Sequence, residues 1–138
     1  MKLVIDSNRV MAGLIKDSIT RMIILNEKFE FIAPEYLLTE IYKHRDYLMK
    51  KAHLSDREFE LTLSTLMERI DFIPEDEFMG SLEKAEKIMK DIDPKDSPFL
   101  AVGLSFKIEG IWSEDKDFDQ QDVIKRYSTK DLFTIIHP

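Results

Sequence analysis

Short apolar runs alternate with longer amphipathic segments along this chain. The first run covers residues 2–5 and ends directly at Asp6, Ser7 and Asn8. A four-residue apolar run that stops at a polar residue is typical of a buried central strand. Similar runs predict further strands over residues 30–33, 71–74, 110–113 and 123–127.

The segments between these runs carry apolar residues at helical spacing. Proline suits the first turn of a helix, so Pro34 and Pro98 are expected near helix starts. A capping box begins at Ser55, and Ser128 is expected to cap the last helix. The pattern predicts helices over residues 19–25, 34–51, 56–69, 77–90, 98–106 and 129–135.

Alternation of strands with helices predicts a parallel sheet with right-handed crossovers. The expected fold is α/β, a three-layer α/β/α sandwich around a central parallel sheet of four or five strands. At 138 residues, with no repeat or low-complexity linker, residues 1–138 are expected to form one domain. Trp112 in the fourth strand is expected in the core.

Composition narrows the candidate chemistry. The chain has no cysteine, which excludes disulfides, thiolate metal sites and cysteine nucleophiles. With no recognisable secretion signal or apolar span, we expect a cytoplasmic protein that does not contact a membrane. The net charge of −7 argues against a generally basic surface. A nucleic-acid substrate would therefore need locally placed cations.

Acidic residues gather where the predicted strands end. Asp6 ends the first strand, and Asp115 and Asp117 follow the fourth. The carboxyl ends of parallel strands share one edge, where open α/β sheets place their chemistry. Glu40 lies on or beside the apolar stripe of the helix over 34–51, an unusual position for an unpaired acid. Strand order alone does not place Asp96 at this edge.

Four motifs in this order resemble the PIN-domain nucleases. They are Asp6-Ser7-Asn8, the helical Glu40, Asp96 ahead of the small-residue apolar helix over 98–104, and the run from Ser113 to Phe118. The resemblance covers essentially the whole chain and implies a PIN-like fold.

By this resemblance, Asp6, Glu40, Asp96 and Asp115 form the acidic quartet that holds divalent metal and carries catalysis. Asp117 is an accessory metal-binding carboxylate, and the side chains expected to orient the acids are those of Asn8 and Ser113. This chain departs from the family pattern at two positions. Glu114 adds an acid beside Asp115, and Asp93 competes with Asp96 for the third position. We prefer Asp96, because the apolar helix follows it at the family's distance.

The residue types support metal chemistry independently of the resemblance. Clustered carboxylates raise one another's pKa unless a cation lies among them. Oxygen ligands favour Mg²⁺ or Mn²⁺. One or two such ions can activate water for attack on a phosphodiester. Together with this chemistry, the resemblance implies a metal-dependent (endo)ribonuclease, a hydrolase that cleaves single-stranded RNA. The resemblance further implies a toxin of a toxin–antitoxin pair, an antitoxin protein as partner and a homodimer.

Other functions stay open at this point. One alternative is a catalytically silent PIN-fold binding or regulatory module. Two further candidates lack a required residue. A receiver-type phosphotransfer domain needs an aspartate at the end of the third strand, and residues 71–74 offer none there. A haloacid-dehalogenase-like phosphatase needs Asp-x-Asp where Asp6-Ser7-Asn8 stands, and is discounted.

Simpler structural roles also exist for the single residues. Asp6 and Asp96 could be helix caps, Glu40 could pair with a nearby cation, and the loop over 114–122 could be a solvated acidic loop. The helix after Pro34 carries a basic and aromatic flank that suits RNA stacking and phosphate contact, or else is an ordinary solvated face. Its members are Tyr36, Tyr42, Lys43, Arg45, Tyr47, Lys50 and Lys51.

Overall fold

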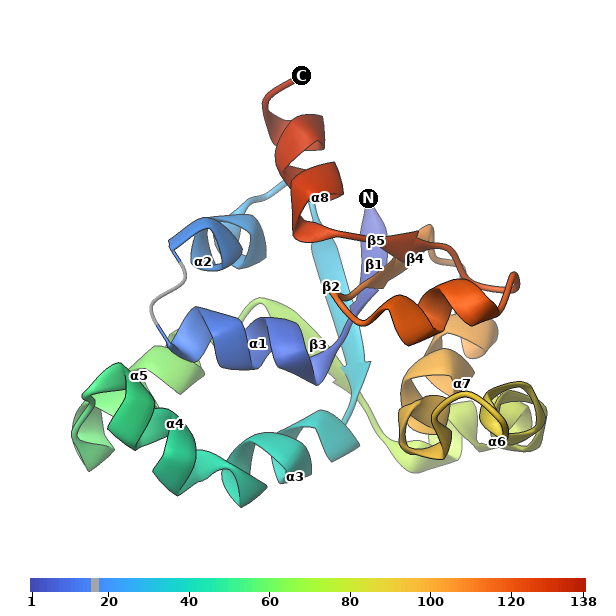
Figure 1. Ribbon diagram of the computed structural model, residues 1–138, viewed down its shortest axis with the longest axis horizontal. Helices are drawn as coiled ribbons and strands as arrows, with labels where there is room; N and C mark the ends of the chain where they lie inside the picture. The colour runs from blue at the N-terminus through green and yellow to red at the C-terminus, as the bar shows by residue number, and fades with distance from the viewer. Residues whose placement is uncertain (16–17) are drawn as a thin grey trace.

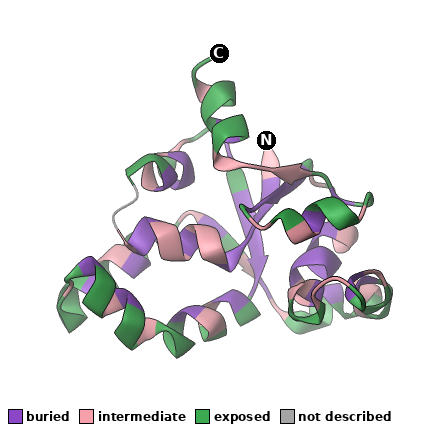
Figure 2. Cartoon of the chain, viewed as in Figure 1, coloured by how far each residue is buried: buried purple, intermediate pink, exposed green. Residues whose placement is uncertain are grey.

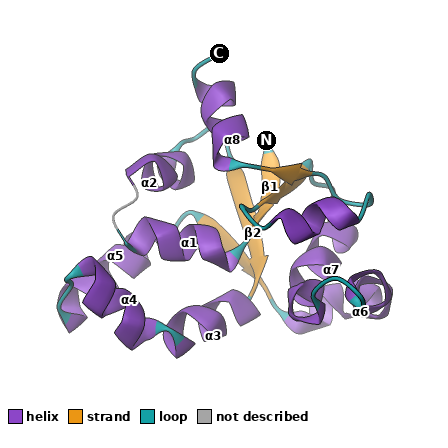
Figure 3. Cartoon of the chain, in the orientation of Figure 1, coloured by secondary structure: helices purple, strands orange, loops and turns teal. Residues whose placement is uncertain are grey.

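The computed structural model describes residues 1–15 and 18–138 and contains one five-stranded sheet. All paired strands run parallel, and the order across the sheet is β3-β2-β1-β4-β5. β1 therefore occupies the centre, as its apolar sequence predicts (Figure 3). The strands are β1 (Lys2–Ile5), β2 (Glu30–Pro34), β3 (Ile70–Ile73), β4 (Gly110–Trp112) and β5 (Arg126–Tyr127).

Helices cover both faces of the sheet and give the expected three-layer α/β/α architecture (Figure 1). On one side lie α1 (Ser7–Leu14), α2 (Ser18–Leu25), α3 (Tyr36–Lys43), α4 (Arg45–Ala52) and α5 (Asp56–Met67). On the other side, α6 (Glu75–Met89) packs along α7 (Ser97–Ser105). The last helix, α8 (Thr129–Ile136), contacts α2 and β5. None of the helices in residues 1–15 and 18–138 is long and apolar enough to span a membrane.

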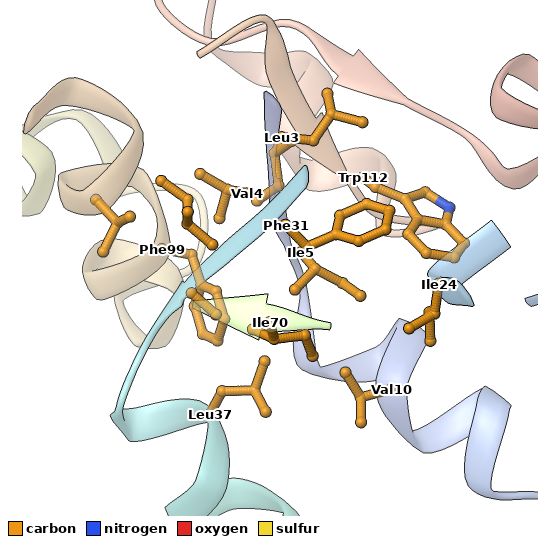
Figure 4. Close-up of a cluster of buried hydrophobic side chains, with 14 of the residues drawn as sticks. Leu3, Val4, Ile5, Val10, Ile24, Phe31, Leu37, Ile70, Phe99 and Trp112 are labelled. Carbon is orange, nitrogen blue, oxygen red and sulfur yellow. The ribbon is translucent and has the colours of Figure 1, made fainter. Parts of the chain in front are cut away.

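The core forms where the central strands meet the helices. Leu3, Val4 and Ile5 of β1 are fully buried, and Figure 4 shows them between Phe99 of α7 and residues of the opposite layer. Trp112 is fully buried, as expected. Burial is concentrated in the sheet and the inner faces of the helices, whereas the outer faces are exposed (Figure 2). The sheet thus gives a fixed base for side chains at its carboxyl edge.

Capping residues were predicted well because caps depend on nearby residues alone. Ser55 and Ser128 both form complete capping boxes, at the starts of α5 and α8.

The prediction for residues 34–51 was wrong, since Pro34 ends β2 and the segment divides into α3 and α4 at His44. Arg45, the first residue of α4, binds carboxylates of α5, a tertiary contact that periodicity does not reveal.

The fifth strand is shorter than the predicted 123–127 and covers Arg126–Tyr127 alone. The backbone N–H groups of Val123 and Ile124 donate to the side-chain oxygen of Gln121 instead of to a neighbouring strand. Ile124 is nevertheless buried and packs against Gly103 of α7. The packing is tight, since a Cβ added to Gly103 would lie 3.0 Å from Ile124 Cδ1. Apolar patterning identified the burial but not the backbone pairing.

Candidate metal centre

The central pair of strands, β1 and β4, marks the point where the sheet order reverses. From β1 the chain moves outward to β2 and β3, then crosses back to β4 and β5. Open α/β sheets bind ligands outside the carboxyl ends of strands at such a point. Asp6 follows β1 and Ser113 follows β4, and the Asp6 N–H donates to the carbonyl of Trp112 at 3.1 Å. Strand order alone therefore brings these two residues together.

Asp6 is a buried carboxylate, only 4% exposed. Its Oδ2 accepts hydrogen bonds from Ser113 Oγ at 2.6 Å and from Asn8 Nδ2 at 3.0 Å. Burial, with smaller contributions from the negative charges of Glu40 and Asp115, raises the pKa of Asp6 to about 6, although the Ser113 hydrogen bond opposes the shift. Asn8 and Ser113 thus fix the orientation of a carboxylate that is costly to ionise.

Asp115 is held by a turn that starts at Ser113. The Asp115 N–H donates to Ser113 Oγ at 2.9 Å, and Asp115 Oδ1 accepts the N–H of Asp117 at 2.9 Å. Asp115 thereby caps the short 3₁₀ helix η2 (Lys116–Gln120). Asp117 Oδ1 accepts from Gln120 Nε2 at 3.2 Å.

Glu40 reaches the site from α3. Its side chain is half-buried, and Oε1 accepts a hydrogen bond from Ser7 Oγ at 2.8 Å. Burial raises the pKa of Glu40, while the Ser7 hydrogen bond and the charges of His44 and Lys43 act in the opposite direction. Glu40 is thus bound to the first residue of α1, next to Asp6.

Asp93 and Asp96 enter through η1 (Pro94–Asp96), the single 3₁₀ turn between α6 and α7. Asp93 caps this turn, with Oδ1 accepting the Lys95 N–H at 3.1 Å. Asp96 Oδ2 is buried and has no hydrogen-bond partner. Burial first, then the charges of neighbouring carboxylates led by that of Asp6, raises the pKa of Asp96 to about 8. Of the acids at this edge, Asp96 most needs a cation.

Three of these acids converge closely enough to share an ion. One carboxylate oxygen each from Asp93, Asp96 and Asp115 lies within 4.8 Å of the others. An all-oxygen ligand set suits Mg²⁺ or Mn²⁺, and both ions commonly keep waters as further ligands. The unpartnered buried oxygen of Asp96 is an independent sign that this position accommodates a cation. The donor set therefore fits a hard divalent ion.

The structure also places the remaining predicted residues. Asp6 and Glu40 border the group of three, and their charges act on Asp96. We weighed Asp93 against Asp96, and both lie in the group because η1 spans only three residues. Asp117 lies outside it. Glu114, the additional acid, accepts the backbone N–H of Thr129 at 2.6 Å, at the start of α8.

Two residues near the site were not among the predicted site residues. Arg9 donates to Asn8 Oδ1 at 2.9 Å and to Thr129 Oγ1 at 3.1 Å, which leaves the Asn8 amide N–H directed at Asp6. The charges of Glu40 and Asp96 add to the burial that raises the pKa of Tyr36, so its hydroxyl lies near the acids. The position of Arg9 directly after Asp6-Ser7-Asn8 was an available signal.

Comparison with known families agrees with this geometry. A family model described as PIN domain matches residues 4–130, and the chain therefore belongs to the PIN-domain family. A search of curated proteins found no match to this chain. PIN domains are generally nucleases and typically use divalent metals, and the acidic cluster of this chain lies in the matched region.

Proposed function

We propose that this protein is a divalent-metal-dependent endoribonuclease that hydrolyses phosphodiester bonds of single-stranded RNA. The observation that carries the proposal is the convergence of Asp93, Asp96 and Asp115, with a buried Asp96 oxygen that has no partner. Three carboxylates this close are unfavourable in the absence of a cation, and a bound divalent ion makes the same position attractive to phosphate.

The residues divide the work by position. Asp93, Asp96 and Asp115 would hold Mg²⁺ or Mn²⁺, and the ion supplies water activation and charge neutralisation. Asp6 faces the same centre and is oriented by Ser113 and by Asn8.

Glu40 lies beside these acids, and the hydroxyl of Ser7 holds its side chain in place through a hydrogen bond. Because carboxylates bind the ion and water is the nucleophile, the reaction requires no protein nucleophile, which agrees with a chain that lacks cysteine.

The finer parts of the proposal rest on the resemblance. RNA rather than DNA as substrate, a toxin role with an antitoxin protein as inhibitor, and a homodimer follow from the similarity of the four motifs to the PIN-type toxins. A small open reading frame directly beside the gene would support the toxin role.

Cleavage assays test the activity directly. The purified protein is incubated with end-labelled single-stranded RNA and with DNA of the same sequence, in Mg²⁺, Mn²⁺ or EDTA. We expect internal cleavage of RNA in either metal and none in EDTA. Asp96→Asn and Asp6→Asn should abolish cleavage, whereas Asp122→Asn, at an exposed acid in the loop before β5, should not. Full activity in both site variants would refute the proposal, and an absence of metal binding by calorimetry together with no cleavage of RNA would favour a silent binding module.

A further inference from the structure

A stripe of cations extends from the acidic centre along the outer edge of the α3 and α4 layer. We define the α4 stripe as Lys43, Tyr47, Lys50 and Lys51. Lys43 ends α3, while Lys50 and Lys51 lie three and four residues after Tyr47 on α4 and so flank the Tyr47 side chain on that helix. All four side chains are exposed, Tyr47 at 59%. Figure 1 shows α3 leading from the end of β2 into α4, away from α6 and α7.

The lysines of this stripe form no ion pair with a carboxylate of the described residues. Within residues 1–15 and 18–138, no carboxylate forms an ion pair with Lys43, Lys50 or Lys51. Arg45 differs, because it binds Asp56 at 3.0 Å and joins α4 to α5.

Tyr47 adds an aromatic surface to the stripe. Lys51 Nζ lies 5.6 Å from the centroid of the Tyr47 ring and donates to its hydroxyl at 3.3 Å. Tyr47, Lys50 and Lys51 line one surface hollow together with His53. Exposed aromatic rings beside cations are the elements that bind single-stranded nucleic acid without sequence preference.

The stripe starts at the acidic centre. The charges of Lys43 and His44 both act on Glu40, so the end of α3 is within electrostatic reach of the site. From Glu40 to Lys51 the chain advances by about 17 Å at 1.5 Å per helical residue. A strand with a phosphate at the acids could therefore continue along the stripe.

We propose that the α4 stripe binds the backbone of the single-stranded RNA that extends from the acidic centre, with Tyr47 stacking on one base. The inference rests on the proposed function for its substrate. Charge complementarity selects this occupant. An acidic protein must place its phosphate-binding cations locally, and these three lysines form no ion pair and lie on helices that lead away from the site, with Lys43 within electrostatic reach of Glu40.

Binding and cleavage are measured separately to test this proposal. All variants are made in an Asp96→Asn background that leaves RNA intact, and binding of a fluorescein-labelled single-stranded RNA is followed by anisotropy at several salt concentrations. Lys50→Ala/Lys51→Ala should weaken binding and reduce the slope of log affinity against log salt by about 1.4, from two lost phosphate contacts. Tyr47→Ala should weaken binding by roughly 5- to 150-fold.

The matched control is Lys28→Ala/Lys107→Ala, which removes the same charge at exposed positions before β2 and β4, at the opposite edge of the sheet. It should bind RNA with the parental salt slope. In the otherwise unmodified enzyme, the stripe variants should raise KM and leave kcat near its original value.

The proposal would be overturned if neither stripe variant changed RNA affinity or the salt slope. The α4 stripe would then be a binding surface for another partner, such as an acidic protein. This result is distinct from failure of the proposed function, in which the unmodified protein cleaves no RNA.

Discussion

The buried Oδ2 of Asp96, which has no hydrogen-bond partner, leads to a prediction about how the stability of the protein depends on pH. The pKa of this group is 3.8 in an unfolded chain and about 8 in the metal-free fold. Between these pH values the folded protein binds one more proton than the unfolded chain, so the free energy of unfolding falls as pH rises. The contribution is fully present below pH 3.8 and is lost as pH approaches 8. Asp96→Asn removes this titration and should stabilise the metal-free protein at neutral pH.

The magnitude follows from the pKa difference. Each pH unit within this interval lowers the free energy of unfolding by about 1.4 kcal/mol. Between pH 4 and 7 the loss is therefore at most about 4 kcal/mol. Solvent screens part of this because Asp96 is not fully buried, so we expect about 2 kcal/mol. For a chain of 138 residues this corresponds to a rise in Tm of roughly 8 °C for Asp96→Asn.

Urea unfolding followed by circular dichroism measures the effect at pH 5, 6, 7 and 8 in EDTA. The wild-type protein should lose stability across this range, and Asp96→Asn should lose less. Saturating Mn²⁺ should make the wild type more stable than Asp96→Asn. A ligand at 100 times its Kd adds about 2.7 kcal/mol to the free energy of unfolding of a protein that binds it. Asp122→Asn serves as the control and should follow the wild type. A flat wild-type profile, or a metal-free Asp96→Asn protein less stable than wild type at pH 7.5, would refute the reasoning.

Three other substitutions test the supports of the site and the fold. Ser113→Ala removes a hydrogen-bond donor to Asp6 and should lower the free energy of unfolding in urea by about 1–3 kcal/mol. It should also weaken metal binding 10- to 100-fold by calorimetry, and an unchanged metal affinity would contradict the orienting role of Ser113. Gly110→Ala places a Cβ against the Lys125 carbonyl, so thermal unfolding should show a loss of about 1–3 kcal/mol or more. Ser55→Ala breaks the cap of α5 and should cost about 1 kcal/mol in the same assay while cleavage stays unchanged.

Local sequence predicted the features that depend on near neighbours. The apolar run before Asp6 predicted the central strand, and the capping boxes at Ser55 and Ser128 predicted two helix starts to within a residue. The parallel sheet followed from the alternation of strands and helices. These predictions succeeded because strand burial and helix capping are decided within a few residues.

Predictions that depend on the path of the chain could not be completed from sequence. Whether Asp93 and Asp96 reach Asp115 depends on where α7 begins relative to the sheet edge, which is set by the packing of α7 on β1, β2 and α6. At the division at His44, Arg45 contacts Asp56 of α5. Neither contact leaves a periodic signal.

The acidic centre is assembled from the same turns that build the fold. Asp93 Oδ1 accepts the Lys95 N–H to start η1, and Asp115 Oδ1 accepts the Asp117 N–H to start η2. Each of these two aspartates therefore belongs both to a turn and to the acidic cluster. Because backbone hydrogen bonds hold the carboxylates in place, their repulsion cannot be relieved by rotating the side chains outward without losing a cap. The fold thereby keeps the negative charges close together, and a divalent cation relieves the repulsion without moving either turn.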